Sequence, residues 1–98
     1  MAVTYEQARD IVRRATEPDW PAGTYCLDDR KIVENDAFYV FEVGAREFLV
    51  DGDMSYMMAG SVPVVHKADG RLEFLPSFQI GTDPSIRNRP NPAPTIQV

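Results

Sequence analysis

His66 is the only histidine in the sequence and the first residue to consider for catalysis. A catalytic histidine needs a nucleophile or an acid within reach and a group that orients its ring. Cys26, Ser55 and Ser61 are available, but none has the spacing of a nucleophile elbow around it. We therefore expect His66 to be an ordinary strand or hairpin residue, and the protein not to be an enzyme.

Acidic residues recur in short groups, at 28–29, 34–36 and 51–53, that could in principle hold a hard cation. A calcium loop needs five or more oxygen ligands at fixed offsets and a closing glutamate, and none of these groups continues in that way. Glu42 and Glu47 could act as an acid/base pair, but we expect them on an exposed hairpin around a turn. We expect no metal and no cofactor.

The charge is unevenly distributed along the chain. The net charge is −5, and residues 17–53 contain ten acids and only three bases. Such a field repels nucleic acid and anionic lipid and attracts a basic partner. The alternative is an acidic surface that only favours solubility.

Two aromatic residues stand out as contacts for such a partner. Trp20 lies between two prolines in the acidic segment, where an aromatic side chain is a common interface anchor; the alternative is that it caps the core edge. Tyr56 lies in a methionine-rich connector, whose alternative role is core filling. The candidate partner-binding residues are Trp20, Asp28, Asp29, Glu34, Asp36 and Tyr56.

Helical periodicity is confined to the N-terminus. Thr4 and Gln7 match a capping box, and the apolar spacing after them predicts a helix over about residues 4–16 that buries Ala8, Ile11, Val12 and Ala15. Strand patterns follow at 37–43, 47–50, 62–67 and 71–75, with a short helical turn within 54–60. Residues 24–33 are ambiguous and fit a strand interrupted by an Asp-Asp turn or bulge.

These elements predict one α+β domain over residues 1–82: an N-terminal helix packed on a mainly antiparallel four- to five-stranded sheet. Residues 83–98 contain four prolines, so we expect an extended C-terminal tail that lies along a surface. The length of 98 residues suits one domain, with little interior for a deep active-site cleft.

Location and assembly are less constrained. No apolar run is long enough to cross a membrane, and the N-terminus lacks the pattern of a secretory signal. A single cysteine, without a partner for a disulfide, is typical of a reducing compartment, so we expect a cytoplasmic protein. The oligomeric state stays open, with a homodimer among the alternatives.

The order of features resembles the immunity protein 35 family, which overlaps with the YrhB-like domain of small bacterial proteins. The resemblance spans roughly residues 4–78. It rests on the aromatic strand "FYVFEV", on "REFL" at 46–49, on the connector from 51–53 to 59–60, and on the hairpin "PVVHKADG" at 63–70. These motifs are strands and turns, so they specify a fold better than an activity.

The resemblance implies a protein that neutralises a bacterial toxin by stoichiometric binding and blockade, without catalytic residues. The implied partner is a cognate toxin, basic if it acts on nucleic acid. One branch of these domains is described as chaperone-like, which gives a second hypothesis: a small holdase that binds unfolded chains. A small-ligand-binding or enzymatic domain is the third.

Overall fold

The N-terminal helix begins at a reciprocal cap. The computed structural model describes residues 2–58 and 60–98, and its first element is α1, Tyr5–Thr16. The amide of Gln7 donates to Thr4 Oγ1 over 3.1 Å, and the amide of Thr4 donates to Gln7 Oε1 over 2.9 Å. This confirms the predicted capping box, a device that stabilises a helix by about 1 kcal/mol.

The face of α1 that packs on the sheet is shifted toward its N-terminus. Tyr5, Ala8 and Val12 are buried, and Ile11 packs at the edge of the same core. The prediction that Ala15 is buried is wrong, because it is exposed. In the last helical turn it is Thr16 that faces the sheet, with its hydroxyl 2.8 Å from the hydroxyl of Tyr25.

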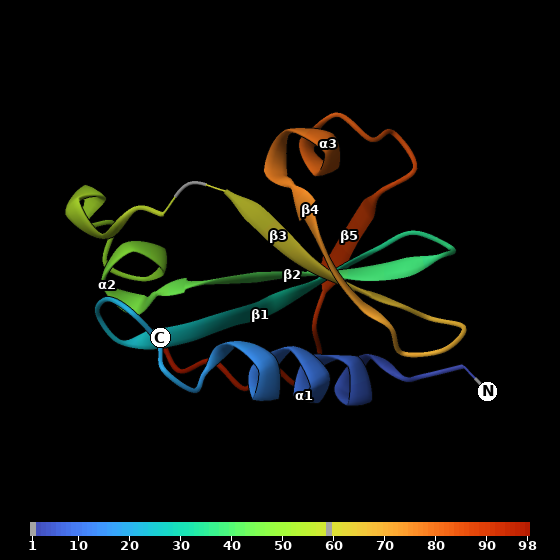
Figure 1. The fold of residues 1–98 in the computed structure, drawn as a ribbon, viewed down its shortest axis with the longest axis horizontal. Coiled ribbons are helices and arrows are strands. Elements are labelled where there is room, and N and C mark those ends of the chain that lie inside the picture. The colour runs from blue at the N-terminus through green and yellow to red at the C-terminus, as the bar shows by residue number, and fades with distance from the viewer. Residues whose placement is uncertain (1, 59) are drawn as a thin grey trace.

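Five antiparallel strands form one sheet in the order β4-β3-β2-β1-β5, and α1 crosses one face of it (Figure 1). This confirms the α+β class, with a helix packed on a mainly antiparallel sheet. The strands are β1 Tyr25–Glu34, β2 Phe38–Ala45, β3 Ser61–His66, β4 Leu72–Pro76 and β5 Arg87–Pro90.

The ambiguous segment is a strand with an irregularity. The register of β1 against β2 shifts between Asp28 and Val33, which corresponds to the expected interruption near the Asp-Asp pair. Leu27 and Ile32 therefore both reach the core under α1, although five positions separate them. In a regular strand, residues at that spacing would point to opposite faces.

Two short helices follow β2 and replace a predicted strand. The expectation of a strand at 47–50 is wrong: β2 runs through Gly44 to Ala45, and α2, Arg46–Leu49, follows directly. The amide of Arg46 donates to the carbonyl of Thr24 over 2.8 Å, which turns the chain out of the sheet. A 3₁₀ turn, η1, Met54–Tyr56, lies within the predicted helical turn at 54–60, of which Ala59 is outside the described residues.

The hairpin between β3 and β4 has the predicted turn. The amide of His66 donates to Arg71 and the amide of Gly70 donates to His66, both over 2.9 Å. Gly70 has φ +76°, a conformation that suits glycine. A third short helix, α3, Ser77–Gly81, follows β4 and was not predicted.

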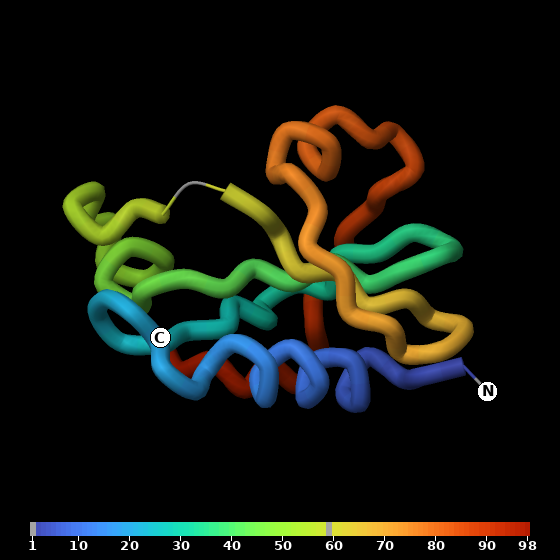
Figure 2. The backbone as a smooth tube through the Cα atoms, in the orientation of Figure 1, coloured from blue at the N-terminus to red at the C-terminus, as the bar shows by residue number. Residues whose placement is uncertain are grey.

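The proline-rich segment lies against the sheet. It is extended and adds the edge strand β5 to β1, and Thr95 and Ile96 then donate to the buried carboxylate of Asp29. Figure 2 shows this C-terminal segment running beside α1, where Arg13 contacts Thr95. The division into a domain over residues 1–82 and a tail over 83–98 stays a prediction.

Candidate functional site

A large cavity lies in a wedge between β2 and β3. In the described part of the chain, the ladder joins only residues 38–40 of β2 to 64–66 of β3. Beyond it the two strands diverge on the side where α2 lies (Figure 1). The cavity between them has a volume of about 1010 Å³ and extends from the end of α1, at Thr16, to α3, at Ile80. We call this cavity the wedge.

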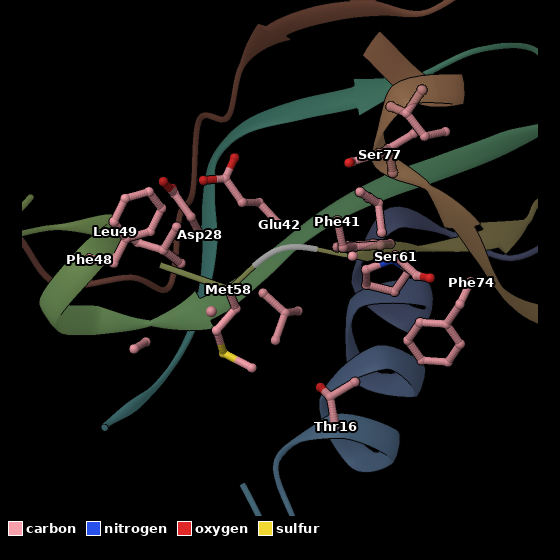
Figure 3. A pocket seen from close by; sticks show the side chains of 18 of the residues that line it. Thr16, Asp28, Phe41, Glu42, Phe48, Leu49, Met58, Ser61, Phe74 and Ser77 are labelled. Atoms are coloured by element: carbon pink, nitrogen blue, oxygen red, sulfur yellow. The ribbon is translucent and has the colours of Figure 1, made fainter. Parts of the chain in front are cut away.

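Apolar side chains form both walls of the wedge. The connector of α2 and η1 supplies one wall, and β4 with α3 supplies the other (Figure 3). Met58 and Phe74, which stand on opposite walls, are 49% and 52% exposed. Exposed apolar residues that face a shared cavity are typical of a binding surface. The apolar wall residues include Phe48, Leu49, Tyr56, Met58, Phe74 and Ile80.

A contact between α2 and the residue before β1 positions the first wall. The carboxylate of Glu47 accepts hydrogen bonds from the amide and the hydroxyl of Thr24, over 2.9 and 3.0 Å. The pKa of Glu47 lies below its usual value, and the hydrogen bond from the backbone amide of Thr24 is the largest cause. Gly23 lies beside this contact with φ +70°, and a Cβ there would lie 2.9 Å from Tyr56 Cδ1. Tyr56 therefore packs against a site that only glycine fits.

Gly44 allows α2 to fold over β2. A Cβ at Gly44 would lie 3.3 Å from a methyl carbon of Leu49, closer than most contacts of this kind. The carbonyl of Leu49 also accepts a hydrogen bond from Arg30 over 3.3 Å. Gly44 is thus a residue of β2, inside the stretch between Glu42 and Glu47 where a turn was expected, and it gives room to a wedge wall.

Two carboxylates face each other across β1 and β2 at the wedge. Asp28 and Glu42 are register partners, and Figure 3 shows their carboxylates close together. Arg30 binds Asp28 through two nitrogens, at 3.0 and 2.6 Å, and these bonds are the main cause that lowers the pKa of Asp28. Among residues 2–58 and 60–98, Glu42 has no hydrogen bond or ion pair with another side chain.

Glu42 is accessible to solvent, but its carboxylate lies at the mouth of an apolar cavity. This partial burial raises the pKa of Glu42, repulsion by Asp28 raises it further, and Arg30 opposes both effects. The carboxylate is thus held where its charge is disfavoured and only partly compensated. A cation delivered to this position would relieve that cost.

Half of the predicted partner-binding residues come together at the wedge: Trp20, Asp28 and Tyr56. The indole of Trp20 packs edge-to-face on Tyr25 with the ring centroids 5.3 Å apart, and its Nε1 donates to the carbonyl of Ala22 over 2.7 Å. Trp20 is thus both fixed to the core edge and partly open to the cavity.

The other three predicted residues lie away from the wedge. Asp29 is fully buried under the C-terminal segment, and Glu34 is 9% exposed and paired with Lys67 and Arg89. Asp29 and Glu34 are therefore buried and are not part of an exposed acidic surface. Asp36 is fully accessible, with 97% of its side chain exposed and an ion pair to Arg87.

Sequence reasoning missed Glu42 and Phe74 as site residues. Glu42 was expected at an exposed hairpin, but it lies inside β2 and faces the wedge. Phe74 belongs to an ordinary strand pattern, and only the divergence of β2 and β3 opens a cavity beside it. The one signal in the sequence was the charged position of Glu42 within an otherwise apolar strand.

His66 and Cys26 were the first residues considered for chemistry. In the part of the chain that the structure describes, neither lies in an arrangement typical of a catalytic site. His66 Nε2 lies 2.9 Å from Glu73 and 3.2 Å from Arg71, on the hairpin. Burial raises the pKa of the Cys26 thiol, which disfavours the reactive thiolate. No group of three or more potential metal ligands lies together in residues 2–58 and 60–98.

Comparison with known proteins adds no assignment. No family model, no curated protein and no solved structure matches the chain. Within the residues that the structure describes, every helix is too short or too polar to span a bilayer. The resemblance to the immunity protein 35 family accordingly stays a hypothesis, and the case for function rests on the wedge.

Proposed function

We propose that this chain is a protein-binding module that uses the wedge to hold a partner. In the cell, it acts as an immunity protein that blocks a cognate toxin by stoichiometric binding. The observation that carries the binding role is the open apolar wedge, with Met58 and Phe74 exposed on opposite walls. The identity of the partner as a toxin comes only from the family resemblance.

The size and shape of the wedge favour a polypeptide partner. Pockets for small molecules usually enclose about 300–1,000 Å³ and bury most of the ligand. The wedge, at about 1010 Å³, lies at the upper end of that range and opens to solvent near both walls. Methionine and aromatic side chains are enriched at the centres of protein interfaces, where they supply most of the binding energy.

Charge supports a basic partner. The net charge of −5 repels nucleic acid and speeds the approach of a positively charged protein. The charged residues that line the wedge are Asp28, Glu42, Arg30 and Lys31. Arg30 binds Asp28, so Glu42 is the lining carboxylate without a hydrogen-bonded side-chain partner among the described residues, and Asp36 remains open to solvent elsewhere on the molecule. A basic protein is therefore steered to this chain and meets the carboxylate of Glu42 at the wedge.

A chaperone-like role is the second candidate, and one observation favours it. Apolar side chains are also exposed outside the wedge walls, including Met54, Met57 and Phe78 at 65%, 55% and 80%. A holdase binds many unfolded chains through dispersed apolar surface, with weak dependence on any single residue. An immunity protein binds one partner, with strong dependence on a few residues.

A matched pair of methionine variants tests the proposal. The tagged chain first captures its partner from a lysate of the organism that encodes it, and calorimetry then measures the affinity. Met58→Lys places a charge on a wedge wall, whereas Met54→Lys makes the same change on the same connector, outside the cavity lining. We expect Met58→Lys to weaken binding at least about tenfold and Met54→Lys to leave it unchanged. Equal affinities for both variants would exclude the wedge as the binding surface.

A further inference from the structure

One side of β2 lacks a strand partner inside the wedge. Toward β1, residues 42–45 pair with 25–28. Toward β3, in the part of the chain that the structure describes, pairing stops after residue 40. Strand residues without a ladder partner present free N–H and C=O groups, which are a template for an added strand. At about 3.3 Å per residue, residues 41–45 offer about 16 Å of such backbone.

Glu42 lies within this unpaired stretch. It is the one side chain of residues 41–45 that carries a charge, and its neighbours in the strand are apolar or glycine. Directly opposed residues of antiparallel strands have Cβ atoms about 4.5–5.5 Å apart and share a face of the sheet. A residue placed opposite Glu42 on an added strand would therefore bring its side chain to the carboxylate.

We propose that the occupant of the wedge is an extended polypeptide segment that adds to β2 as a strand and presents a lysine or arginine to Glu42. This inference rests on the proposed function and specifies the chemistry of the partner. The basic side chain neutralises Glu42, whose charge Arg30 compensates only in part because it binds Asp28. It also replaces water at the mouth of an apolar cavity, where a charge-assisted hydrogen bond is strong.

The walls define the rest of the segment. Side chains alternate between the faces of a strand, so residues on either side of the basic one point toward the α1 side of the wedge. That side is lined by Phe41 and Trp20. The residues two positions away share the face of Glu42 and lie over Val40 and Gly44. The recognised segment is thus a basic residue flanked on both faces by apolar residues, without proline where its amides must donate.

A displayed library of random peptides, selected separately on three immobilised proteins, tests the proposal. The proteins are the wild type, Glu42→Gln and Glu17→Gln. Glu17→Gln removes the same charge from an exposed position after α1 and serves as the control. We expect peptides selected on wild type and on Glu17→Gln to share one lysine or arginine with apolar residues around it. Selection on Glu42→Gln should lose the preference for the basic residue.

Synthetic versions of the most enriched peptide then test the strand. We expect Glu42→Gln to weaken its binding at least about tenfold. Alternate backbone amides of the bound peptide donate to β2, and N-methylation of these amides should abolish binding. N-methylation of the other amides, which point away from β2, should be tolerated. Peptides without a basic residue, equal binding to Glu42→Gln, or tolerance of methylation in both registers would overturn the inference. An absence of any enriched peptide would do the same.

The two proposals fail in different ways. If Met58→Lys weakens binding of the captured partner and Glu42→Gln does not, the wedge binds protein by another mode, such as a docked helix. Only the strand inference is then wrong. If neither variant weakens binding of that partner, the wedge is not the binding surface and the proposed function is wrong. Self-association of the wild type that Met58→Lys abolishes would identify a second copy of this chain as the occupant and overturn the basic-segment inference.

Discussion

Replacement of Asp29 by alanine is expected to be among the most damaging single changes in this protein. The side chain is fully buried, and it accepts bonds from Thr95 N, Thr95 Oγ1 and Ile96 N over 2.8, 2.6 and 3.0 Å. Arg9, only 15% exposed, donates to the same carboxylate over 3.0 Å. One side chain therefore joins β1, α1 and the C-terminal segment.

The expected magnitude follows from these contacts. Removal of one partner of a buried ion pair costs about 3–5 kcal/mol, because the other charge stays buried without compensation. A domain of this size has a total stability of about 5–15 kcal/mol, so the loss is a large fraction. With a urea m value of about 1.5 kcal/mol/M, the unfolding midpoint of Asp29→Ala should fall by about 2–3 M.

Urea unfolding followed by the fluorescence of Trp20, the only tryptophan, measures this change. Asp36→Ala is the matched control, since it removes the same charge from a side chain that is 97% exposed. Its midpoint should stay close to that of the wild type. If the midpoints of the two variants fall equally, Asp29 does not hold the C-terminal segment in place.

The same site predicts a dependence on pH. Burial alone would raise the pKa of Asp29, but hydrogen bonds from Thr95 and Ile96 and the charge of Arg9 outweigh it, and the pKa is lowered. A carboxyl group with a lowered pKa in the folded state stabilises the fold above its unfolded pKa of about 3.9. That contribution is lost as the pH falls through the lower, folded value. The stability difference between wild type and Asp29→Ala should therefore shrink below about pH 4.

Three further changes have defined outcomes. Deletion of residues 91–98 should destabilise the protein. Its effect and that of Asp29→Ala should be non-additive in a double-mutant cycle, because both changes remove the same contacts. Additive losses of stability would contradict this. Gly23→Ala should cost about 1–3 kcal/mol in thermal unfolding, since φ is +70° and the new Cβ meets two side-chain atoms at 2.9 Å; Gly81→Ala, with open space around it, is the control. His66→Ala should change stability by less than about 1 kcal/mol, and loss of partner binding with an intact fold would show that His66 has a functional role.

Local signals in the sequence predicted the elements that depend on neighbouring residues. The capping box at Thr4, the aromatic strand β2 and the Asp-Gly turn before Arg71 each contain their own determinants. The segment at 47–50 misled the prediction because four apolar or charged residues fit a strand or a helical turn equally well. What decides its structure is a contact with Thr24, 23 positions earlier.

The candidate site was harder to predict for a related reason. The burial of Asp29 depends on donors 66 and 67 positions later in the chain, so charge counting placed it on the surface. The wedge exists because β2 and β3 diverge after three paired residues, and no local pattern specifies where a ladder ends. Trp20 and Tyr56 were found by residue type, whereas Glu42 required the register of β1 and β2.

The wedge as the binding surface is tested most directly by amide NMR of the ¹⁵N-labelled chain during titration with its purified partner. We predict that the largest shift changes fall on residues 41–45 of β2 and on the wedge walls near Tyr56 and Phe74. Phe74→Ser should remove those changes, and Phe78→Ser, at an exposed residue outside the cavity lining, should keep them. Shift changes concentrated on the exposed face of α1 or on β5 would contradict the wedge as the binding surface.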